Sequence, residues 1–383
     1  MIVTRTPFRI TLGGGGTDLP SFYQDHGGFL VAVAINKYMY LNVNTPILDD
    51  LIRVRYSKTE IVSRVEEVSH TLARAALSYF GIKDGIEINS IADIPAGTGL
   101  GSSSCYLVGL LNALHALVQN PVGPQQLAEE ACHIELDLLK KPIGKQDQFM
   151  AAFGGLVVLN ISRSGEVSVQ PLAVSPDVIE ELESNLLLFY TGEVRDATTI
   201  LAQQNDATKR NDSQVLGSLT EIKDIGIEIA AALVSGNLRR FGELMHEHWM
   251  AKKRLAKGIS NPNIDAWYEL ARQNGAIGGK ISGAGGGGFL MLYCEKGKAQ
   301  LRKALRAAGL RELSFMFEFE GSKVVFDIVS RDGRLAHMHR NIGNGRRTRY
   351  ATVSGGAAPD RGNGAASAAS IALGKGYLSG AES

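Results

Sequence analysis

A glycine-rich segment is the feature that most limits what this chain can fold into. It is the decapeptide Pro-Ala-Gly-Thr-Gly-Leu-Gly-Ser-Ser-Ser at residues 95–104, which follows an apolar run and opens into a helical pattern over residues 105–118. Glycines without a Cβ let backbone N–H groups approach an anion, and the first turn of the next helix adds unsatisfied donors and the positive end of its dipole. The pattern therefore predicts a phosphate-binding loop, and the serine hydroxyls at its end can serve an anion or a metal ion.

Two better-known phosphate motifs do not fit this segment. A Walker loop requires a lysine directly after its last glycine, and Gly101 is followed by serine. The dinucleotide fingerprint requires the spacing G-x-G-x-x-G between a strand and a helix, whereas Gly97, Gly99 and Gly101 are spaced G-x-G-x-G. That fingerprint spacing does occur at residues 283–288, but the apolar run that follows it predicts a strand rather than a helix. We interpret that match as accidental.

The composition indicates an ordinary globular chain and excludes several partners. The 383 residues are 44% hydrophobic and 21% charged, which suffices for a large core and two domains. The formal charge is only +1, so we expect neither a nucleic acid nor a membrane surface as a partner. We find no secretory pattern and no run of 18 apolar residues, and Cys105, Cys132 and Cys294 lack C-x-x-C spacing. A cytoplasmic protein without a disulfide framework or a zinc site is expected.

Short apolar runs separated by glycine and turn residues predict strands. They lie at residues 9–12, 29–35, 38–43, 51–56, 85–90, 156–161, 167–172, 289–293, 315–320 and 323–328. Helical periodicity predicts helices at residues 70–80, 102–118, 124–140, 238–255, 264–273 and 298–308, within a mostly helical stretch from 179 to 273. Because strands and helices do not alternate strictly, we predict an α+β fold. Its two domains are expected at residues 1–175 and 176–330, followed by a Gly/Ala/Ser/Arg-rich tail at 331–383 that is predicted to be disordered.

Four segments in a fixed order carry a resemblance to a known family. They are residues 7–18 (PFRITLGGGGTD), the decapeptide, residues 144–148 (GKQDQ) and residues 280–288 (KISGAGGGG). Together they resemble the GHMP kinase superfamily over residues 1–328. Within it, the opening segment and residues 246–253 are similar to the D-glycero-D-manno-heptose 7-phosphate kinases.

The resemblance implies a two-domain GHMP kinase fold with the active site in the cleft between the domains. It also implies ATP- and Mg²⁺-dependent transfer of the γ-phosphoryl group to the anomeric hydroxyl of a heptose 7-phosphate or a related higher-carbon sugar phosphate. The product would be a 1,7-bisphosphate. The enzyme would thus bind a small sugar phosphate, and a homodimer is a possible assembly.

The resemblance also assigns catalytic and metal-binding residues. Asp147 would accept the proton of the sugar hydroxyl, Arg9 would contact the transferring phosphate or sugar hydroxyls, and Lys145 would neutralise phosphoryl charge or orient Asp147. The hydroxyl of Ser103 and the carboxylate of Glu135, twelve residues before Asp147, would bind Mg²⁺, which prefers few protein oxygens beside waters and phosphates.

Larger sets are implied for the nucleotide and the substrate. The ATP-binding residues would be Pro95, Gly97, Gly99, Leu100, Gly101, Ser102, Ser103 and Ser104. The substrate-binding residues would be Arg9, Thr17, Asp18, Ser282, Gly283, Ala284, Gly285 and Lys252. A distal phosphate requires guanidinium or ammonium groups, for which the further candidates are Lys253, Arg254 and Arg195.

Each assignment has a structural alternative. Asp147 could cap a short helix at residues 148–152, Glu135 could be one more exposed acid, and Arg9 with Asp18 could form a structural ion pair. The glycines of residues 13–16 could admit either a ligand or another backbone. Two other functions also stay open, namely a GHMP kinase for an unphosphorylated sugar such as fucose or galactose, and a catalytically silent ligand sensor. His246 and His248 are interpreted as core or surface residues.

Overall fold

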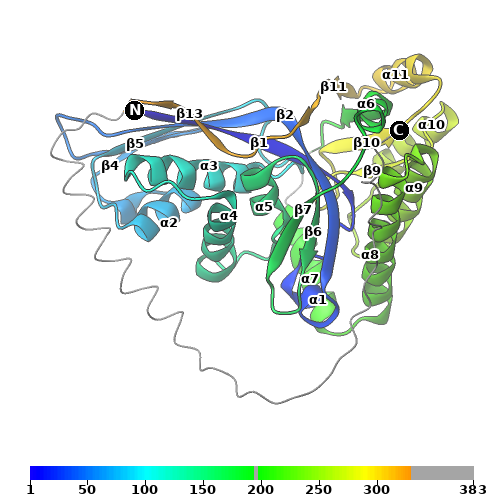
Figure 1. Cartoon of the computed structure of the whole chain (residues 1–383), viewed down its shortest axis with the longest axis horizontal. Helices are drawn as coiled ribbons and strands as arrows, with labels where there is room; N and C mark the ends of the chain where they lie inside the picture. Colours follow the sequence, from blue (N-terminus) through cyan, green and yellow to red (C-terminus); the bar gives the residue numbers. More distant parts are fainter. Residues whose placement is uncertain (194–196, 329–383) are drawn as a thin grey trace, which may run out of the picture.

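The computed structural model describes residues 1–193 and 197–328, and within them strands and helices form two α+β units (Figure 1). The predicted α+β fold is confirmed. Arg195 and the tail at 331–383 lie outside the described residues. Among the residues described, no helix is both long and apolar enough to cross a membrane.

The larger sheet is built around one long antiparallel hairpin. In the order β13-β1-β2-β5-β3-β4, with β12 and β6 also paired to β2 and β7 paired to β6, it comprises nine strands among the described residues. They are β1 (Ile2–Gly13), β2 (Gly28–Asn44), β3 (Ile52–Arg55), β4 (Thr59–Val62), β5 (Ile86–Ala92), β6 (Leu156–Ile161), β7 (Val167–Pro171), β12 (Phe317–Glu318) and β13 (Lys323–Asp327). Strand β2 is therefore the centre of the sheet.

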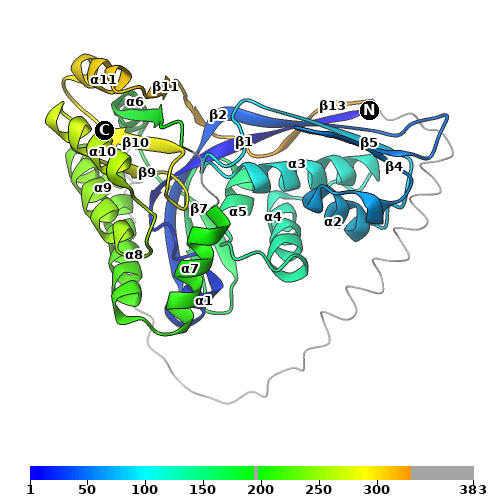
Figure 2. The same cartoon turned by 180° about the vertical axis from the view of Figure 1, so that it is seen from behind.

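The burial of β2 shows where this sheet is covered on both faces. Residues 30–35 are all fully buried, whereas residues 40–44 alternate between buried and partly exposed. A strand buried on both faces lies between two layers, and an alternating strand has one face in solvent. The covered half of β2 lies between the helices below the sheet and the helices of the second unit (Figures 1 and 2).

The helices of the first unit cover one face of this sheet. They are α1 (Pro20–His26), α2 (Thr71–Phe80), α3 (Ser102–Leu117), α4 (Pro124–Cys132) and α5 (Gln146–Phe153), with a 3₁₀ turn at Val65–Glu67 and a π-helical segment, η2, at His133–Leu138. Helix α3 packs directly on β1 and β2 and is apolar on nearly every side, which is typical of a helix enclosed in a core. Its N-terminus, at the end of the glycine-rich loop, is thereby held in place.

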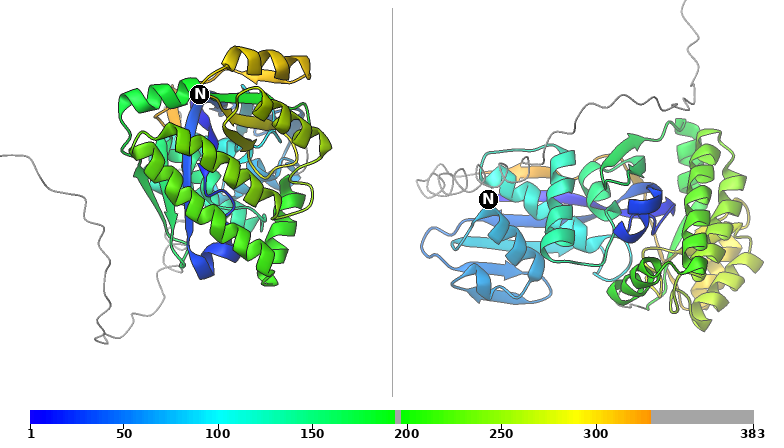
Figure 3. Two further views of the ribbon diagram at one scale, coloured as in Figure 1. Left: turned by 90° about the vertical axis from the view of Figure 1, so that its right-hand side faces the viewer. Right: turned by 90° about the horizontal axis from the view of Figure 1, so that it is seen from below.

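The second unit stacks helices on a four-stranded antiparallel sheet at one end of the molecule (Figure 3). The strand order is β11-β8-β10-β9, formed by β8 (Leu186–Tyr190), β9 (Gly278–Ile281), β10 (Phe289–Tyr293) and β11 (Arg311–Leu313). The helices are α6 (Pro176–Asn185), α7 (Ala197–Lys209), α8 (Ser213–Val234), α9 (Leu238–Lys253), α10 (Pro262–Gln273) and α11 (Lys298–Ala307).

Glycines let the two units approach closely. A Cβ on Gly13 at the end of β1 would lie 3.0 Å from Cα of Gly226 in α8, and a Cβ on Gly14 would lie 1.8 Å from the carbonyl oxygen of Phe29. These two glycines therefore allow one backbone segment to pack directly against another. Gly15 and Gly16 instead line a cavity between the units, and close approach of a ligand stays a prediction for these two residues.

Several element boundaries differ from the sequence predictions. The runs at 29–35 and 38–43 form the single strand β2, helix α1 was not predicted, and β8 interrupts the stretch expected to be helical. The last two strands, β12 and β13, return to the first unit, where they pair with β2 and β1 instead of completing the second unit. Register with distant strands decides such pairings, and local periodicity does not contain that information.

Candidate active site

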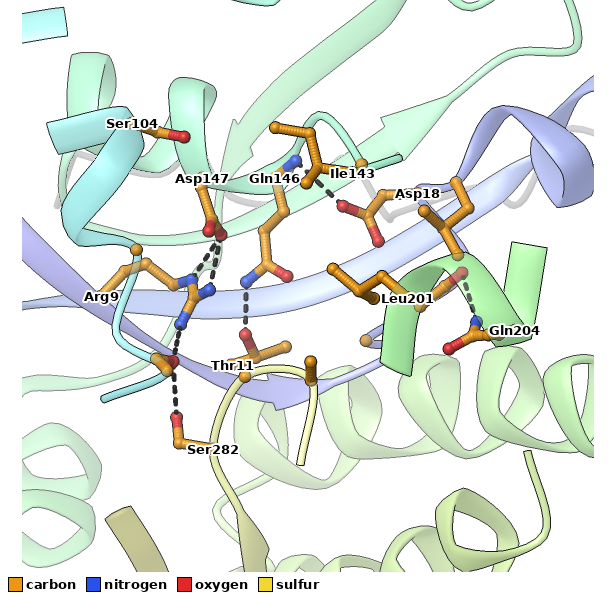
Figure 4. Close-up of a pocket in the computed structure, with 18 of the residues that line it drawn as sticks. Arg9, Thr11, Asp18, Ser104, Ile143, Gln146, Asp147, Leu201, Gln204 and Ser282 are labelled. Carbon is orange, nitrogen blue, oxygen red and sulfur yellow. Dashed lines mark hydrogen bonds and ion pairs between the residues drawn. The ribbon is translucent and has the colours of Figure 1, made fainter. Parts of the chain in front are cut away.

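The glycine-rich segments meet around a cavity of about 440 Å³ between the two units (Figure 4). Its wall includes Gly15 and Gly16, the loop from Gly97 to Ser104 except Thr98 and Leu100, and residues 282–284. The first turn of α5 contributes Asp147 to the same wall. Segments far apart in the sequence thus converge on one site.

The predicted phosphate loop has the backbone of an anion site. Gly97, Gly99 and Gly101 adopt φ values of +80°, +82° and +86°, which L-residues with a side chain rarely adopt. Gly101 is the N-cap of α3 and offers no side-chain cap, so the first N–H groups of α3 remain available to a ligand. An anion here would accept hydrogen bonds from those N–H groups, and the positive end of the helix dipole would stabilise its charge.

Two members of the predicted ATP-binding set do not line this cavity. Leu100 is 1% exposed and packs in the hydrophobic core. Pro95 is exposed, and its carbonyl accepts a hydrogen bond from the Thr98 hydroxyl at 3.0 Å. Both residues shape the loop, and neither side chain faces the ligand space.

The third glycine segment lies directly against the phosphate loop. A Cβ on Gly283 would lie 2.6 Å from Cα of Gly99, and Ser282 Oγ donates to the Gly99 carbonyl at 3.4 Å. Lys252, on α9, donates to the carbonyls of Ile281 and Gly283. Burial lowers the pKa of the Lys252 ammonium to about 7, and a neutral amine still has two N–H groups for these two carbonyls. Lys252 lines the cavity, but its Nζ is hydrogen-bonded to the third glycine segment.

Arg9 and Asp147 form an ion pair at the cavity wall (Figure 4). Nε and Nη2 of Arg9 lie 2.7 Å and 2.6 Å from Oδ1 of Asp147, and Nη1 donates to the Gly99 carbonyl at 2.8 Å. The Arg9 side chain is 6% exposed, while the Asp147 carboxylate is 31% exposed. Asp147 lies in the first turn of α5, whose N-cap is Lys145, so the alternative in which Asp147 caps this helix is wrong.

Asp18 is buried beside the same turn. Its Oδ2 accepts a hydrogen bond from the backbone N–H of Gln146 at 3.1 Å, and a Cβ on Gly144 would lie 1.9 Å from that oxygen. Burial raises the pKa of the Asp18 carboxyl, with a further contribution from the charge of Asp147. Asp18 has no ion pair with Arg9, whose partner is Asp147. Gly144 is therefore needed to let this turn close over Asp18.

Glu135 is held in a dense hydrogen-bond network next to the phosphate loop. Its Oε1 accepts from Ser103 Oγ at 3.1 Å and from Lys141 Nζ at 2.9 Å. Its Oε2 accepts from Ser104 Oγ at 2.8 Å and from Gln148 Nε2 at 2.7 Å. The carboxylate is fully buried, so the alternative of one more exposed acid is wrong. Buried carboxylates require such compensation by donors.

The residues present fit a magnesium ion bound together with a nucleotide. The described residues contain no group of three or more His, Cys, Asp or Glu side chains that could hold a metal ion alone. Mg²⁺ usually takes one or two carboxylates and completes its shell with waters and substrate phosphates. Glu135 and Ser103 supply a carboxylate and a hydroxyl beside the phosphate loop, and the Lys141 ammonium already shows that a cation is stable between them.

Three further predicted site residues are placed elsewhere. Lys145 donates to the carbonyl of Gly165 and lies over the ring of Tyr23, 5.4 Å from its centroid. The predicted pairing of Lys145 with Asp147 is therefore wrong, because side chains two positions apart at a helix start project to nearly opposite sides. Thr17 is fully buried, and its hydroxyl donates to the backbone carbonyls of Gly14 and Phe29. Gly285 packs against the backbone of residue 259 rather than lining the cavity.

Two candidates for a distal phosphate site, Lys253 and Arg254, are not free cations. Lys253 Nζ lies 3.4 Å from Oδ1 of Asp265, and Arg254 pairs with Glu221 on the surface. Neither side chain lines the cavity.

Sequence reasoning missed several basic or amide groups of the site, among them Lys141, Gln148 and Lys280. Lys280 is 2% exposed, donates to the carbonyl of Leu12 at 2.9 Å and lines the cavity together with the buried His248. Burial lowers the pKa of both side chains well below the ordinary values. Lys280 and Gln148 lie inside motifs that were recognised, and this position could have identified them as site residues. Lys141 lies between motifs, so nothing in the sequence indicated that it belongs to the site.

Comparison with known proteins agrees with this geometry. Residues 61–155 match the family model "GHMP kinases N terminal domain", and residues 229–310 match "GHMP kinases C terminal". These two ranges include the phosphate loop with Glu135 and Asp147, and the third glycine segment with Lys252.

The curated relatives include sugar kinases and mevalonate kinases. A D-glycero-alpha-D-manno-heptose 7-phosphate kinase of Campylobacter jejuni is 29% identical over 84% of this chain and 98% of its own length. An L-fucokinase/L-fucose-1-P guanylyltransferase of Bacteroides fragilis is 29% identical over 78% of this chain, but only over 35% of its own length. Among solved structures, a D-glycero-D-manno-heptose 1-phosphate kinase of Bacteroides thetaiotaomicron has a TM-score of 0.71, 24% identity, and coverage of 86% of this chain and all of its own. That structure supports the fold. The chain belongs to the GHMP kinases, and it is an ATP-dependent phosphotransferase.

Proposed function

We propose that this enzyme transfers the γ-phosphoryl group of ATP to the anomeric hydroxyl of a heptose 7-phosphate or a related higher-carbon sugar phosphate. The observation that carries the reaction is the Arg9–Asp147 pair, which faces the cavity beside an uncapped, glycine-rich helix N-terminus. The substrate class rests on the likeness, over almost its entire length, to the Campylobacter jejuni heptose 7-phosphate kinase. In this proposal the phosphate loop within residues 1–175 binds the nucleotide phosphates, and α9 with the third glycine segment of the second unit closes the cavity.

The phosphate loop would position the triphosphate. Phosphoryl transfer depends mainly on positioning and on neutralisation of charge, because the transition state has little bonding to either oxygen. The N–H groups at the start of α3 and the Ser102 hydroxyl supply donors on one side. Lys252 supports the opposite side through its hydrogen bonds to the third glycine segment.

Asp147 would receive the proton of the attacking hydroxyl. Both contacts from Arg9 fall on Oδ1, so the proposal assigns the proton to Oδ2. Arg9 keeps the carboxylate oriented, and its guanidinium also adds positive charge near the transferring phosphoryl group. Its third contact, to the Gly99 carbonyl, ties this pair to the phosphate loop. The side chain of Arg9 thus connects the proton acceptor to the phosphate loop.

Glu135 and Ser103 would hold Mg²⁺ together with phosphate oxygens of ATP. The ion would neutralise the charge on the phosphates and fix their position relative to the acceptor. Ser104 and Gln148 keep the other carboxylate oxygen of Glu135 in place through hydrogen bonds of 2.8 Å and 2.7 Å. The Mg²⁺ dependence of turnover in Glu135→Gln tests this assignment, because the amide substitution removes the charge and keeps the shape.

A second candidate substrate is an unphosphorylated sugar such as fucose. It is favoured by the likeness to the fucokinase of Bacteroides fragilis and by the surface ion pairs of Lys253 and Arg254, which leave neither side chain at the cavity for a distal phosphate. A panel of heptose 7-phosphate, fucose and galactose separates the two proposals. Faster turnover of a free sugar than of heptose 7-phosphate would replace the first proposal by the second.

A further inference from the structure

The ammonium of Lys141 contacts the same two oxygens that the proposed function assigns to the metal ion. Its Nζ lies 2.9 Å from Oε1 of Glu135 and 3.2 Å from Oγ of Ser103. The Lys141 side chain is 29% exposed, whereas the Glu135 carboxylate is fully buried. The positive group is therefore the mobile partner of this pair, and it can leave toward solvent without opening the core.

The other oxygen of Glu135 offers no second place for a cation. Oε2 accepts hydrogen bonds from Ser104 and Gln148 and lies on the buried side of the carboxylate. A divalent ion must therefore bind through Oε1. Because an ammonium and a divalent cation at one carboxylate oxygen repel each other strongly, the ion and Lys141 exclude one another at this position.

The backbone brings Lys141 to Glu135 through two uncommon conformations. Glu135 lies in the π-helical segment η2, and such segments are rare and frequent at functional sites. Lys140 then adopts φ +51°, a left-handed conformation that is uncommon for a residue other than glycine. The chain turns back at this point, and the N–H of Lys141 donates to the carbonyl of Glu135 at 2.9 Å. A strained turn thus holds the lysine beside the carboxylate.

We propose that Lys141 is a built-in counter-ion that keeps divalent metal away from Glu135 until the nucleotide arrives. The inference rests on the proposed function, in which Glu135 and Ser103 bind the metal. A free metal ion would displace the ammonium and leave it without an anionic partner. A metal ion that arrives with ATP brings phosphates, which give the displaced ammonium a new anionic partner. Metal and nucleotide binding are thereby coupled, and the coupling is reciprocal.

Binding of Mn²⁺, followed by electron paramagnetic resonance, tests this coupling without any turnover. We compare the wild type with Lys141→Met, Lys141→Gln and the charge-retaining Lys141→Arg, each in the absence of nucleotide. The neutral variants should bind Mn²⁺ at least tenfold more tightly than the wild type, and Lys141→Arg should bind it as weakly as the wild type. Lys140→Met removes a neighbouring exposed charge and should leave the affinity unchanged. Equal affinity of the wild type and both neutral variants would overturn the proposal.

A second set of titrations separates this inference from the proposed function. With a non-hydrolysable ATP analogue present, the wild type should bind Mn²⁺ tightly, and Glu135→Gln should lose at least tenfold in affinity. Unchanged affinity in Glu135→Gln would refute both the metal site and the counter-ion. Loss in Glu135→Gln together with no gain in either neutral Lys141 variant would refute the counter-ion alone. Thermal unfolding of each variant shows whether the protein is folded under the conditions of the titration.

Discussion

The contact between Gly283 and Gly99 permits a sharp test of how the cavity is built. Gly283 has φ +69°, and a Cβ there would lie 2.6 Å from Cα of Gly99 and 2.7 Å from its carbonyl oxygen. Carbon atoms normally approach to about 3.5 to 4.0 Å, so Gly283→Ala must separate the two loops by about 1 Å. A displacement of about 1 Å in a positioned site costs on the order of 100-fold in rate. We expect kcat/KM for ATP to fall by about that factor.

Gly81→Ala is the matched control for backbone strain. Gly81 has nearly the same φ, +71°, but a Cβ there would meet nothing within 4 Å, and the residue ends α2 away from the cavity. Both variants should lose about 1 to 2 kcal/mol of unfolding free energy from the left-handed alanine, measured by urea titration. Only Gly283→Ala should also lose activity. Activity of Gly283→Ala within twofold of Gly81→Ala would refute the proposed role of the loop contact.

Three other substitutions test individual groups. Asp147→Asn should lower kcat by about 10² to 10⁴-fold with nearly unchanged ATP affinity in a binding titration, and a near-normal kcat would remove Asp147 from the mechanism. Lys145→Met should keep kcat within about threefold in a steady-state assay, because its ammonium faces Gly165 and Tyr23; a loss like that of Asp147→Asn would restore its catalytic role. Lys252 has a pKa lowered from 10.5 to about 7, so the unfolded chain binds a proton there that the folded chain lacks, and stability should rise between pH 7 and pH 10 by up to about 1.4 kcal/mol per pH unit from this residue. Lys252→Met should reduce that slope in urea titrations at several pH values, and an unchanged slope would show that Lys252 stays charged in the folded state.

The phosphate loop and the family were predictable because their signal is local. Positive φ values were predictable from the glycines at positions 97, 99 and 101. The three serines that follow predict the start of a helix with free N–H donors. The order of four such segments then identified the family, which the comparisons confirm. The residue types of these loops alone determine their backbone conformation and the hydrogen-bond donors that they offer.

The direction of individual side chains was not predictable. Lys145 stands two positions from Asp147, and only the start of α5 decides that the two project to opposite sides. Lys141 reaches Glu135 through a π-helical segment and a left-handed Lys140, and neither follows from helical periodicity. The final strands were placed in the wrong unit for a related reason, since their partners are more than 280 positions away.

The position that becomes phosphorylated tests the central claim most directly. The enzyme is incubated with Mg²⁺, ATP and heptose 7-phosphate, fucose or galactose in parallel, and each product is examined by phosphorus NMR. We predict the fastest turnover with heptose 7-phosphate and a product with two phosphate resonances, of which the new one couples to the anomeric proton. A new phosphate at any other carbon, or faster turnover of fucose or galactose, would contradict the proposal.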